Sequence, residues 1–393
     1  MANRSVKAAE LAKMNQKLGP RETCRRLQEA LEKKHLRPHD FSLRDLAEGL
    51  VKDGREYVRL LDPRAYRNSQ TLVEAASGVD TSVFSNITGQ IVYSAIMEAA
   101  VNPAFVGDQL CTTVPTEFSG EKIPGIGPIG DKATTIAEGE AYPLVGVSQQ
   151  YIETPETIKR GLILPITKEA IFFDRTGILM ERCRQVGEWL GWQKEIRILA
   201  EVLGDTNATG GYTPNGYKLN GTAYDAYQTA TPWINSASNP LVDWTDINNA
   251  EDRLFKMTDP MTGEYMMVVP DTIIVPTKLR ATAMMVLGAG AVHIGGATNA
   301  AHYYTDTMNP AQATYSYQLI CSPLIYKVTA SDTIWYLGNF KRAFSYMENW
   351  PITVTQAPSN SEAEFVQDIV VRFKASERGA TVCVEPRCVV LNS

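Results

Sequence analysis

The sequence lacks the residue patterns on which most enzymes and metal proteins depend. It holds four histidines in 393 residues and contains no HExxH, GxSxG or phosphate-loop motif. His35 and His39 have the i, i+4 spacing of two ligands on one helix face. Pro38 lies between them, and Lys34 and Arg37 add positive charge, which disfavours a metal site. We therefore predict that the protein is not an enzyme and has no catalytic, cofactor-binding or metal-binding residues.

Membrane spans, disulfide frameworks and export signals are missing as well. The most apolar stretch, Ala281–Ile294, is shorter than the about 20 residues that a spanning helix needs. The six cysteines include no CxxC pair, which favours reduced thiols. The opening residues, Met1–Gln16, contain no apolar core of a signal peptide. We expect a globular protein of one to three domains that has no membrane contact.

Charge is present but unevenly distributed. The chain has 38 basic and 44 acidic residues, a net charge of −6, which argues against a surface that grips nucleic acid everywhere. Residues 1–70 nevertheless hold 16 basic and 10 acidic residues, and apolar spacing predicts three short helices in them. The third begins near Ser42, with Leu46 and Leu50 on its apolar face. These helices resemble the start of a DNA-binding helix-turn-helix, but an arm that packs on a partner subunit is the favoured interpretation.

Residues 111–165 are rich in proline and glycine, and this composition predicts an extended loop. Six prolines and seven glycines separate short β-type runs there. Gly125–Gly130 matches G-x-G-x-x-G, but no helix pattern follows, so a dinucleotide site is disfavoured. The flanks Leu110–Ile123 and Gln149–Ile166 are predicted to pair as the two legs of a long antiparallel hairpin. Such a hairpin has little core of its own and is typical of an arm that another surface covers.

The remainder alternates helices and strands. Apolar residues at three- and four-residue steps, including Cys183 and Leu190, predict a long helix over 175–203. A lobe with helices and strands follows, and alternating apolar residues predict strands towards the C-terminus. The predicted elements after the long helix are a helix over Trp244–Met257 that Asp243 or Thr245 caps, strands over Met266–Val269 and Thr272–Val275, a helix over Pro276–Leu287, and strands over Phe365–Phe373 and Thr381–Val390.

Several runs, taken in order, resemble the major capsid proteins of tailed bacteriophages with the Hong Kong 97-like fold. The resemblance covers about residues 80–393, and each run is weak when taken alone. The runs are Glu138–Pro143, Thr157–Gly161 and Ile166–Ala170 for the loop that returns to a spine helix, Ile274–Pro276 for the axial domain, and Asp368–Phe373 with Glu377–Gly379 for the closing peripheral strand and its turn.

This resemblance implies an α+β capsid fold with an N-terminal arm, an extended β-hairpin loop, a peripheral domain with a long spine helix, and an α/β axial domain. The implied segments are 1–77 (basic helical segment), 78–110 (arm), 111–165 (loop), 166–240 (peripheral domain with spine helix), 241–340 (axial domain), 341–377 (peripheral strands) and 378–393 (return to the axial domain). The residues that we single out as intersubunit contacts are Lys122, Ile123, Ile126, Ile129, Lys132, Glu138 and Tyr142 in the loop, with Leu46 and Leu50 in the basic segment.

The implied function is that of a major head protein of a tailed phage. It would self-assemble into hexamers and pentamers, which form an icosahedral shell around double-stranded DNA. Its partners would be other copies of itself, a portal protein, scaffold or decoration proteins, and DNA bound without sequence preference. It would be assembled in the host cytoplasm and end in the virion. The alternatives are an encapsulin-like nanocompartment shell protein and, less favoured, a soluble α/β enzyme.

Overall fold

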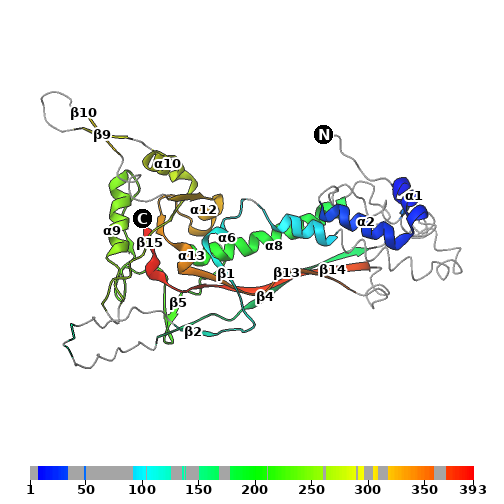
Figure 1. Cartoon of the computed structure of the whole chain (residues 1–393), viewed down its shortest axis with the longest axis horizontal. Coiled ribbons are helices and arrows are strands. Elements are labelled where there is room, and N and C mark those ends of the chain that lie inside the picture. Colours follow the sequence, from blue (N-terminus) through cyan, green and yellow to red (C-terminus); the bar gives the residue numbers. More distant parts are fainter. Residues whose placement is uncertain are drawn as a thin grey trace. The chain divides into compact units, whose positions relative to one another are not determined.

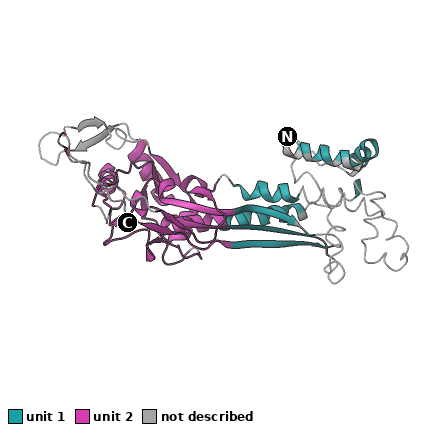
Figure 2. Ribbon diagram, turned by 60° about the horizontal axis from the view of Figure 1, so that its bottom comes forward, with its two compact units in different colours: residues 1–103, 159–193, 350–378 teal, residues 104–158, 194–349, 379–393 magenta. Residues whose placement is uncertain are grey.

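The chain folds into two compact units that each draw on several stretches of sequence. The computed structural model describes residues 8–33, 48–49, 92–102, 104–124, 135–136, 138, 150–167, 178–209, 211–259, 263–288, 291–295, 304–308, 317–357 and 369–393. Unit 1 comprises residues 1–103, 159–193 and 350–378, and unit 2 comprises residues 104–158, 194–349 and 379–393 (Figure 2). Helix α8 and strands β13 and β14 contribute residues to both units.

Two of the predicted N-terminal helices are present in unit 1. Helix α1 (Ala8–Leu18) ends at Gly19, whose φ of +78° suits glycine, and helix α2 (Pro20–Glu32) begins at the next residue. The two helices pack against each other, and Leu11 and Leu27 on their apolar faces are buried. The third predicted helix, with Leu46 and Leu50, lies outside the described residues apart from the helical residues 48–49.

A long helix and a four-stranded sheet supply further residues of unit 1. Residues 92–100 are helical, and α8 (Ile178–Leu203) matches the predicted long helix over its described length (Figure 1). The sheet has the strand order β1-β13-β14-β4, formed by β1 (Thr112–Pro115), β13 (Phe344–Gln356), β14 (Ile369–Cys383) and β4 (Ile158–Thr167). Within unit 1, the Trp350 ring receives cation–π contacts from Lys159 and Arg378, at 5.9 Å and 5.5 Å from the ring centroid.

A five-stranded sheet with the order β11-β8-β12-β15-β7 forms the centre of unit 2. Its middle strands are the most deeply buried, because helices and loops cover them. The strands are β7 (Ser236–Ala237), β8 (Thr272–Val275), β11 (Gln318–Cys321), β12 (Trp335–Gly338) and β15 (Val389–Asn392). Strand β8 pairs parallel with β11 and antiparallel with β12, which in turn pairs antiparallel with β15.

The helices and smaller sheets of unit 2 complete its structure. The helices are α6 (Gly107–Leu110), α9 (Trp244–Phe255), η3 (Thr277–Leu279), α10 (Arg280–Gly288), α12 (Pro323–Thr329), α13 (Phe340–Ala343) and η4 (Pro386–Cys388). A second sheet joins β2 (Lys122–Pro124), β3 (Tyr151–Glu153), β5 (Tyr217–Leu219) and β6 (Thr222–Tyr224), and β9 (Ala291–Gly295) pairs with β10 (Tyr304–Met308). None of the described helices has the length and apolarity needed to cross a bilayer.

Four sequence-based predictions about strands are corrected by the structure. The hairpin legs pair with each other only at β2 and β3, because β1 pairs parallel with β13 and β4 lies beside β14. Met266–Val269 is no strand: it follows a single bridge at Tyr265, and Met267 has a φ of +45°. The turn expected at Glu377–Gly379 is instead part of the continuous strand β14. The strand expected over Thr381–Val390 is interrupted by η4, because β14 ends at Cys383.

Candidate assembly surfaces

The base of the extended loop is a small sheet that carries a cluster of charged side chains. Strands β2 and β3 pair Lys122 with Glu153 and Ile123 with Ile152. The Nζ atoms of Lys122 and Lys218 lie 3.6 Å and 2.5 Å from the two carboxylate oxygens of Glu153. Hydrogen bonding from Lys218 lowers the pKa of Glu153, with Lys122 adding to the effect. Two cations therefore share one carboxylate at the base of the loop.

The predicted contact residues of the loop fall into two groups. Lys122 and Glu138 are exposed, and Ile123 is half-buried on the edge strand β2. The remaining ones, which are Ile126, Ile129, Lys132 and Tyr142, lie outside the described residues, as do Leu46 and Leu50. The role of all these residues in contacts between subunits stays a prediction.

Strand β4 is a second candidate surface, which sequence analysis treated only as a hairpin leg. It lies at the edge of its sheet, and among the described strands its neighbour is β14. Ile158 and Ile163 are 54% and 64% exposed, and Leu162 is exposed as well. Gly161 allows the backbone of β4 to approach that of β14 closely, because a Cβ atom added there would lie 2.6 Å from the carbonyl oxygen of Ala375. An edge strand that exposes apolar side chains is a candidate surface for association with another chain.

Helix α8 supports unit 1 with its apolar face. The predicted face is confirmed where it is described, because Cys183 and Leu190 are buried. Gly187 lies on this face directly against the backbone of Ile96, so closely that a Cβ atom would overlap the Ile96 carbonyl oxygen. Trp189 projects from another side of the helix and is 49% exposed. The helix therefore buries one face against residues 92–100 and leaves an aromatic side chain available to solvent.

Two buried carboxylates on the C-terminal half of α8 fasten loops of unit 2. Glu195 accepts hydrogen bonds from the backbone N–H groups of Val106 (2.7 Å) and Gly107 (2.9 Å), at the start of α6. Glu201 accepts from the N–H groups of Asn215 (2.6 Å) and Gly216 (2.9 Å), just before β5. Each carboxylate thus supplies acceptors for donors that would otherwise be buried without partners.

The protonation of these carboxylates depends on burial. Burial raises the pKa of Glu195, although its backbone donors oppose the shift. Burial raises the pKa of Glu201 further, to about 8, although the hydrogen bonds from the backbone N–H groups of Asn215 and Gly216 favour the charged form. Sequence analysis missed both residues. The one available signal in the sequence was an acidic residue within an apolar helical run. This signal does not predict which backbone N–H groups the carboxylate contacts.

No described group of three or more His, Cys, Asp or Glu side chains could hold a metal ion. The surfaces described above instead combine an α+β architecture, an exposed sheet edge and a charged loop base. That combination is typical of structural proteins that associate with other chains.

Comparison with known proteins identifies the family. A family model described as phage capsid protein matches residues 151–392, more than half of the chain. The chain therefore belongs to the phage capsid protein family. The recognition made from sequence is confirmed, and the protein is a structural component of a phage head rather than an enzyme. No curated protein matches the sequence.

Solved structures resemble the chain remotely. A Gordonia phage Cozz structure has 14% identity and a TM-score of 0.44, with 73% of this chain and 85% of that chain covered. A virus-like particle from Pyrococcus furiosus has 12% identity and a TM-score of 0.39, with coverage of 77% and 97%. The holo-SrpI encapsulin complex from Synechococcus elongatus PCC 7942 has 11% identity and a TM-score of 0.42, with coverage of 75% and 88%.

Proposed function

We propose that the protein is the repeating subunit of an icosahedral head with the Hong Kong 97-like plan. Copies would associate head to tail into hexamers and pentamers, since heterologous contacts close into rings. The ring assemblies would enclose double-stranded DNA without reading its sequence, and a portal and a scaffold or decoration protein would complete the head. The net charge of −6 supports loose contact with packaged DNA rather than tight binding.

The segment boundaries that we propose follow the same Hong Kong 97-like plan. The five-stranded sheet with α9, α10 and α12 is our candidate for the axial domain over 241–340. Helix α8 is our candidate for the spine in 166–240, and the long strands β13 and β14 for the peripheral strands. The loop over 111–165 would extend across a neighbouring subunit.

The observation that carries the proposal is the exposed edge of β4. Among the described strands β4 pairs only with β14, and the exposed side chains of Ile158, Leu162 and Ile163 offer a neighbour apolar area. Each of these side chains is already about half covered, so covering the rest adds about 1 kcal/mol per side chain. A contact of this size is modest, but a shell repeats it in every subunit.

Replacing the tip of the loop tests its part in assembly. Strands β2 and β3 end opposite each other at Pro124 and Tyr151, so a short Gly-Ser turn in place of residues 125–149 preserves their pairing. We expect this variant to fold but to fail in assembly, as seen by electron microscopy and sedimentation. The matched control replaces the same residues with an equally long Gly-Ser segment, which keeps the reach and removes the side chains. Normal shells from the shortened variant would show that the loop is not an intersubunit clamp.

A further inference from the structure

One side of strand β14 in unit 1 carries three basic residues. Arg372, Lys374 and Arg378 are separated by even numbers of residues, so their side chains project from the same side of the strand. The residues that project from the other side between them are buried, and they are Phe373, Ala375 and Glu377. Strand β14 therefore packs one side inside the unit and directs three cations away from it.

Strand β4 adds a fourth cation to the same side of the sheet. Strands β4 and β14 are neighbours (Figure 1). A Cβ atom added at Gly161 would lie 2.8 Å from the Cβ atom of Ser376, so these two positions point to one side of the sheet. Lys159, two residues before Gly161, therefore shares that side with Arg378. Both cations lie over the ring of Trp350, which agrees with this placement.

Acidic side chains of these strands do not balance the four cations, which we call the basic face (Lys159, Arg372, Lys374 and Arg378). Among the described residues of β4, β13 and β14 that belong to unit 1, the one acidic residue is Glu377. It is 2% exposed and projects from the opposite side of β14. The two lysines of the basic face are exposed, and its two arginines are half-buried.

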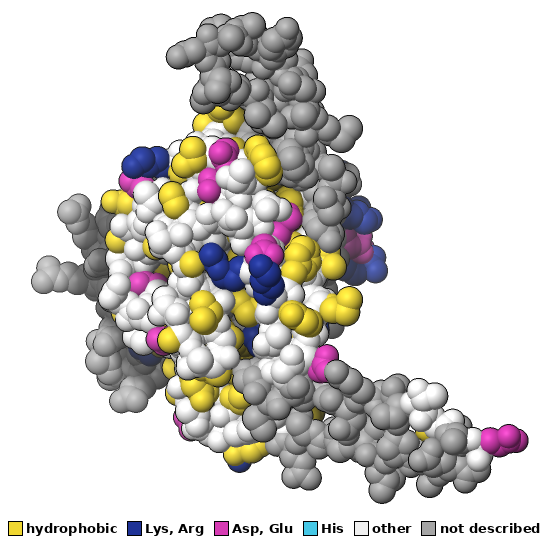
Figure 3. All heavy atoms as spheres, turned by 90° about the vertical axis from the view of Figure 1, so that its left-hand side faces the viewer, with side chains coloured by type: hydrophobic (Ala, Val, Ile, Leu, Met, Phe, Trp, Pro, Cys, Tyr) yellow, Lys and Arg dark blue, Asp and Glu magenta, His cyan; other side chains and the backbone are white. Residues whose placement is uncertain are grey.

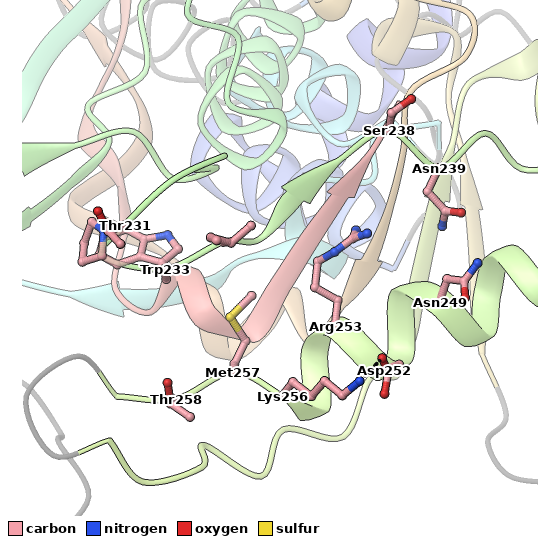
Figure 4. Close-up of a pocket in the computed structure, with 12 residues that line it drawn as sticks. Thr231, Trp233, Ser238, Asn239, Asn249, Asp252, Arg253, Lys256, Met257 and Thr258 are labelled. Carbon is pink, nitrogen blue, oxygen red and sulfur yellow. Dashed lines mark hydrogen bonds and ion pairs between the residues drawn. The ribbon is translucent and has the colours of Figure 1, made fainter.

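Basic side chains on unit 2 lie among acidic ones instead. On the face of the molecule that carries α9, Lys and Arg side chains lie next to acidic and hydrophobic ones (Figure 3). Nζ of Lys256 on α9 lies 2.6 Å from Oδ2 of Asp252 (Figure 4), and Nζ of Lys278 lies 3.7 Å from Oδ2 of Asp332. The basic face is therefore a local feature of the sheet in unit 1.

The composition of the basic face favours a phosphate backbone over a protein partner. Interfaces between proteins are depleted of lysine and depend on an apolar centre. Among the exposed large apolar side chains of β4, only Ile163 shares the side of the cations, because Ile158 and Leu162 project from the other side. Lysines and arginines gathered on one face without acids are typical of surfaces that contact nucleic-acid phosphates.

The spacing of the cations also suits DNA. At about 3.3 Å per residue, the row from Arg372 to Arg378 is about 20 Å long. Duplex DNA carries one phosphate per about 1.7 Å of its axis, so each cation of such a row can meet a phosphate. The guanidinium fork of arginine matches two phosphate oxygens. Contacts to phosphates alone position a duplex and carry no sequence information.

We propose that the basic face binds the phosphate backbone of double-stranded DNA without sequence preference, a step that rests on the proposed enclosure of DNA by the shell. Its four cations pair with phosphate oxygens and release the counterions of the DNA, so salt weakens the contact. The contact is reversible and local, which is compatible with a chain whose net charge is −6.

Two variants of the full chain that lose the same charge test this role. Lys159→Gln/Lys374→Gln removes the two exposed lysines of the basic face and should leave the Tm unchanged, because neither side chain is buried. The matched control is Arg280→Gln/Lys341→Gln, at two exposed cations of unit 2. Fluorescence anisotropy of a labelled duplex of about 20 base pairs measures binding from about 50 to 200 mM NaCl. The protein concentration stays below that at which sedimentation detects assemblies.

The expected changes follow from counterion release. Each lysine that contacts one phosphate adds about 0.9 to the slope of log affinity against log salt concentration, which is about eightfold in affinity at 100 mM salt. We therefore expect Lys159→Gln/Lys374→Gln to weaken DNA binding about 60-fold at 100 mM NaCl and to reduce the slope by about 1.8. Arg280→Gln/Lys341→Gln should change the affinity less than about twofold.

The outcomes separate this inference from the proposed function. DNA binding by the basic-face variant with wild-type affinity and slope would overturn the inference, and normal shells from the wild type would leave the proposed function intact. If that variant bound DNA normally but failed to form shells, an acidic surface of another copy would be the ligand instead. A wild type that does not bind the duplex at about 50 mM NaCl would also overturn the inference. A wild type that never forms shells would overturn the proposed function, while the DNA titration would still decide the role of the basic face.

Discussion

Replacing Gly187 with alanine tests how closely two helices of unit 1 approach each other. A Cβ built at this position overlaps the carbonyl oxygen of Ile96 and lies 2.9 Å from its carbonyl carbon and 3.0 Å from its Cα. All three atoms belong to the backbone, so no side-chain rotation relieves the overlap, and the helix over 92–100 must move away from α8. Ile96 is fully buried, so this movement disturbs packed side chains.

The expected loss of stability follows from two opposing effects. Overpacking costs about 1–3 kcal/mol, and a backbone overlap belongs at the upper end of that range. Alanine in a helix interior is favoured over glycine by about 1 kcal/mol, which offsets part of the cost. We therefore expect Gly187→Ala to destabilise the protein by about 2 kcal/mol, which corresponds to a lowering of Tm by about 4–8 °C.

Thermal and urea unfolding, followed by tryptophan fluorescence, measure this effect. Gly288→Ala at the end of α10 is the matched control, because a Cβ there meets nothing within 4 Å. Gln185→Ala, on an exposed position of α8, controls for helix propensity in the same helix. Both controls should change stability by less than about 0.5 kcal/mol or increase it. If Gly187→Ala were as stable as the wild type, the close packing of these helices would be refuted.

Three further predictions address other parts of the molecule. Leu190→Asp places an unpaired charge on a buried helix face and should lower the free energy of unfolding by several kcal/mol. The control Leu190→Met should lower it by less than about 1.5 kcal/mol. Equal Tm values for the two variants would show that the face is not packed. Burial raises the pKa of Glu201 to about 8, so the unfolded chain ionises first and stability should fall as pH rises from about 4.5 to about 8 and level off above that. Glu201→Gln should flatten this part of the curve of Tm against pH, and an unchanged slope would contradict the assignment. Removing residues 1–70, which carry a net charge of +6, should impair assembly even without DNA. If the truncated protein formed shells of normal size and failed only in DNA packaging, DNA would be the main partner of this segment.

Local interactions determined the elements that could be predicted from the sequence. Helix α9 begins where predicted, because Asp243 accepts from the N–H of Thr245 and Asp246 completes a capping box within a few residues. Strand β8 coincides with the predicted Thr272–Val275, since four consecutive buried residues flanked by Pro and Asp leave little alternative. The long helix α8 followed from its apolar spacing alone. Family membership was also readable, because the order of short motifs survives where no single motif is decisive.

Tertiary structure decided which strands and side chains meet. Strand β1 pairs with β13, more than 200 residues away, rather than with the nearby leg of its loop, because register and partner depend on the assembled sheet. The buried carboxylates of Glu195 and Glu201 find backbone donors whose positions no side-chain pattern encodes. The approach of Gly187 to Ile96 likewise joins segments that are distant in sequence. Sequence patterns report each segment's own periodicity and caps, whereas contacts between distant segments depend on how the whole chain packs.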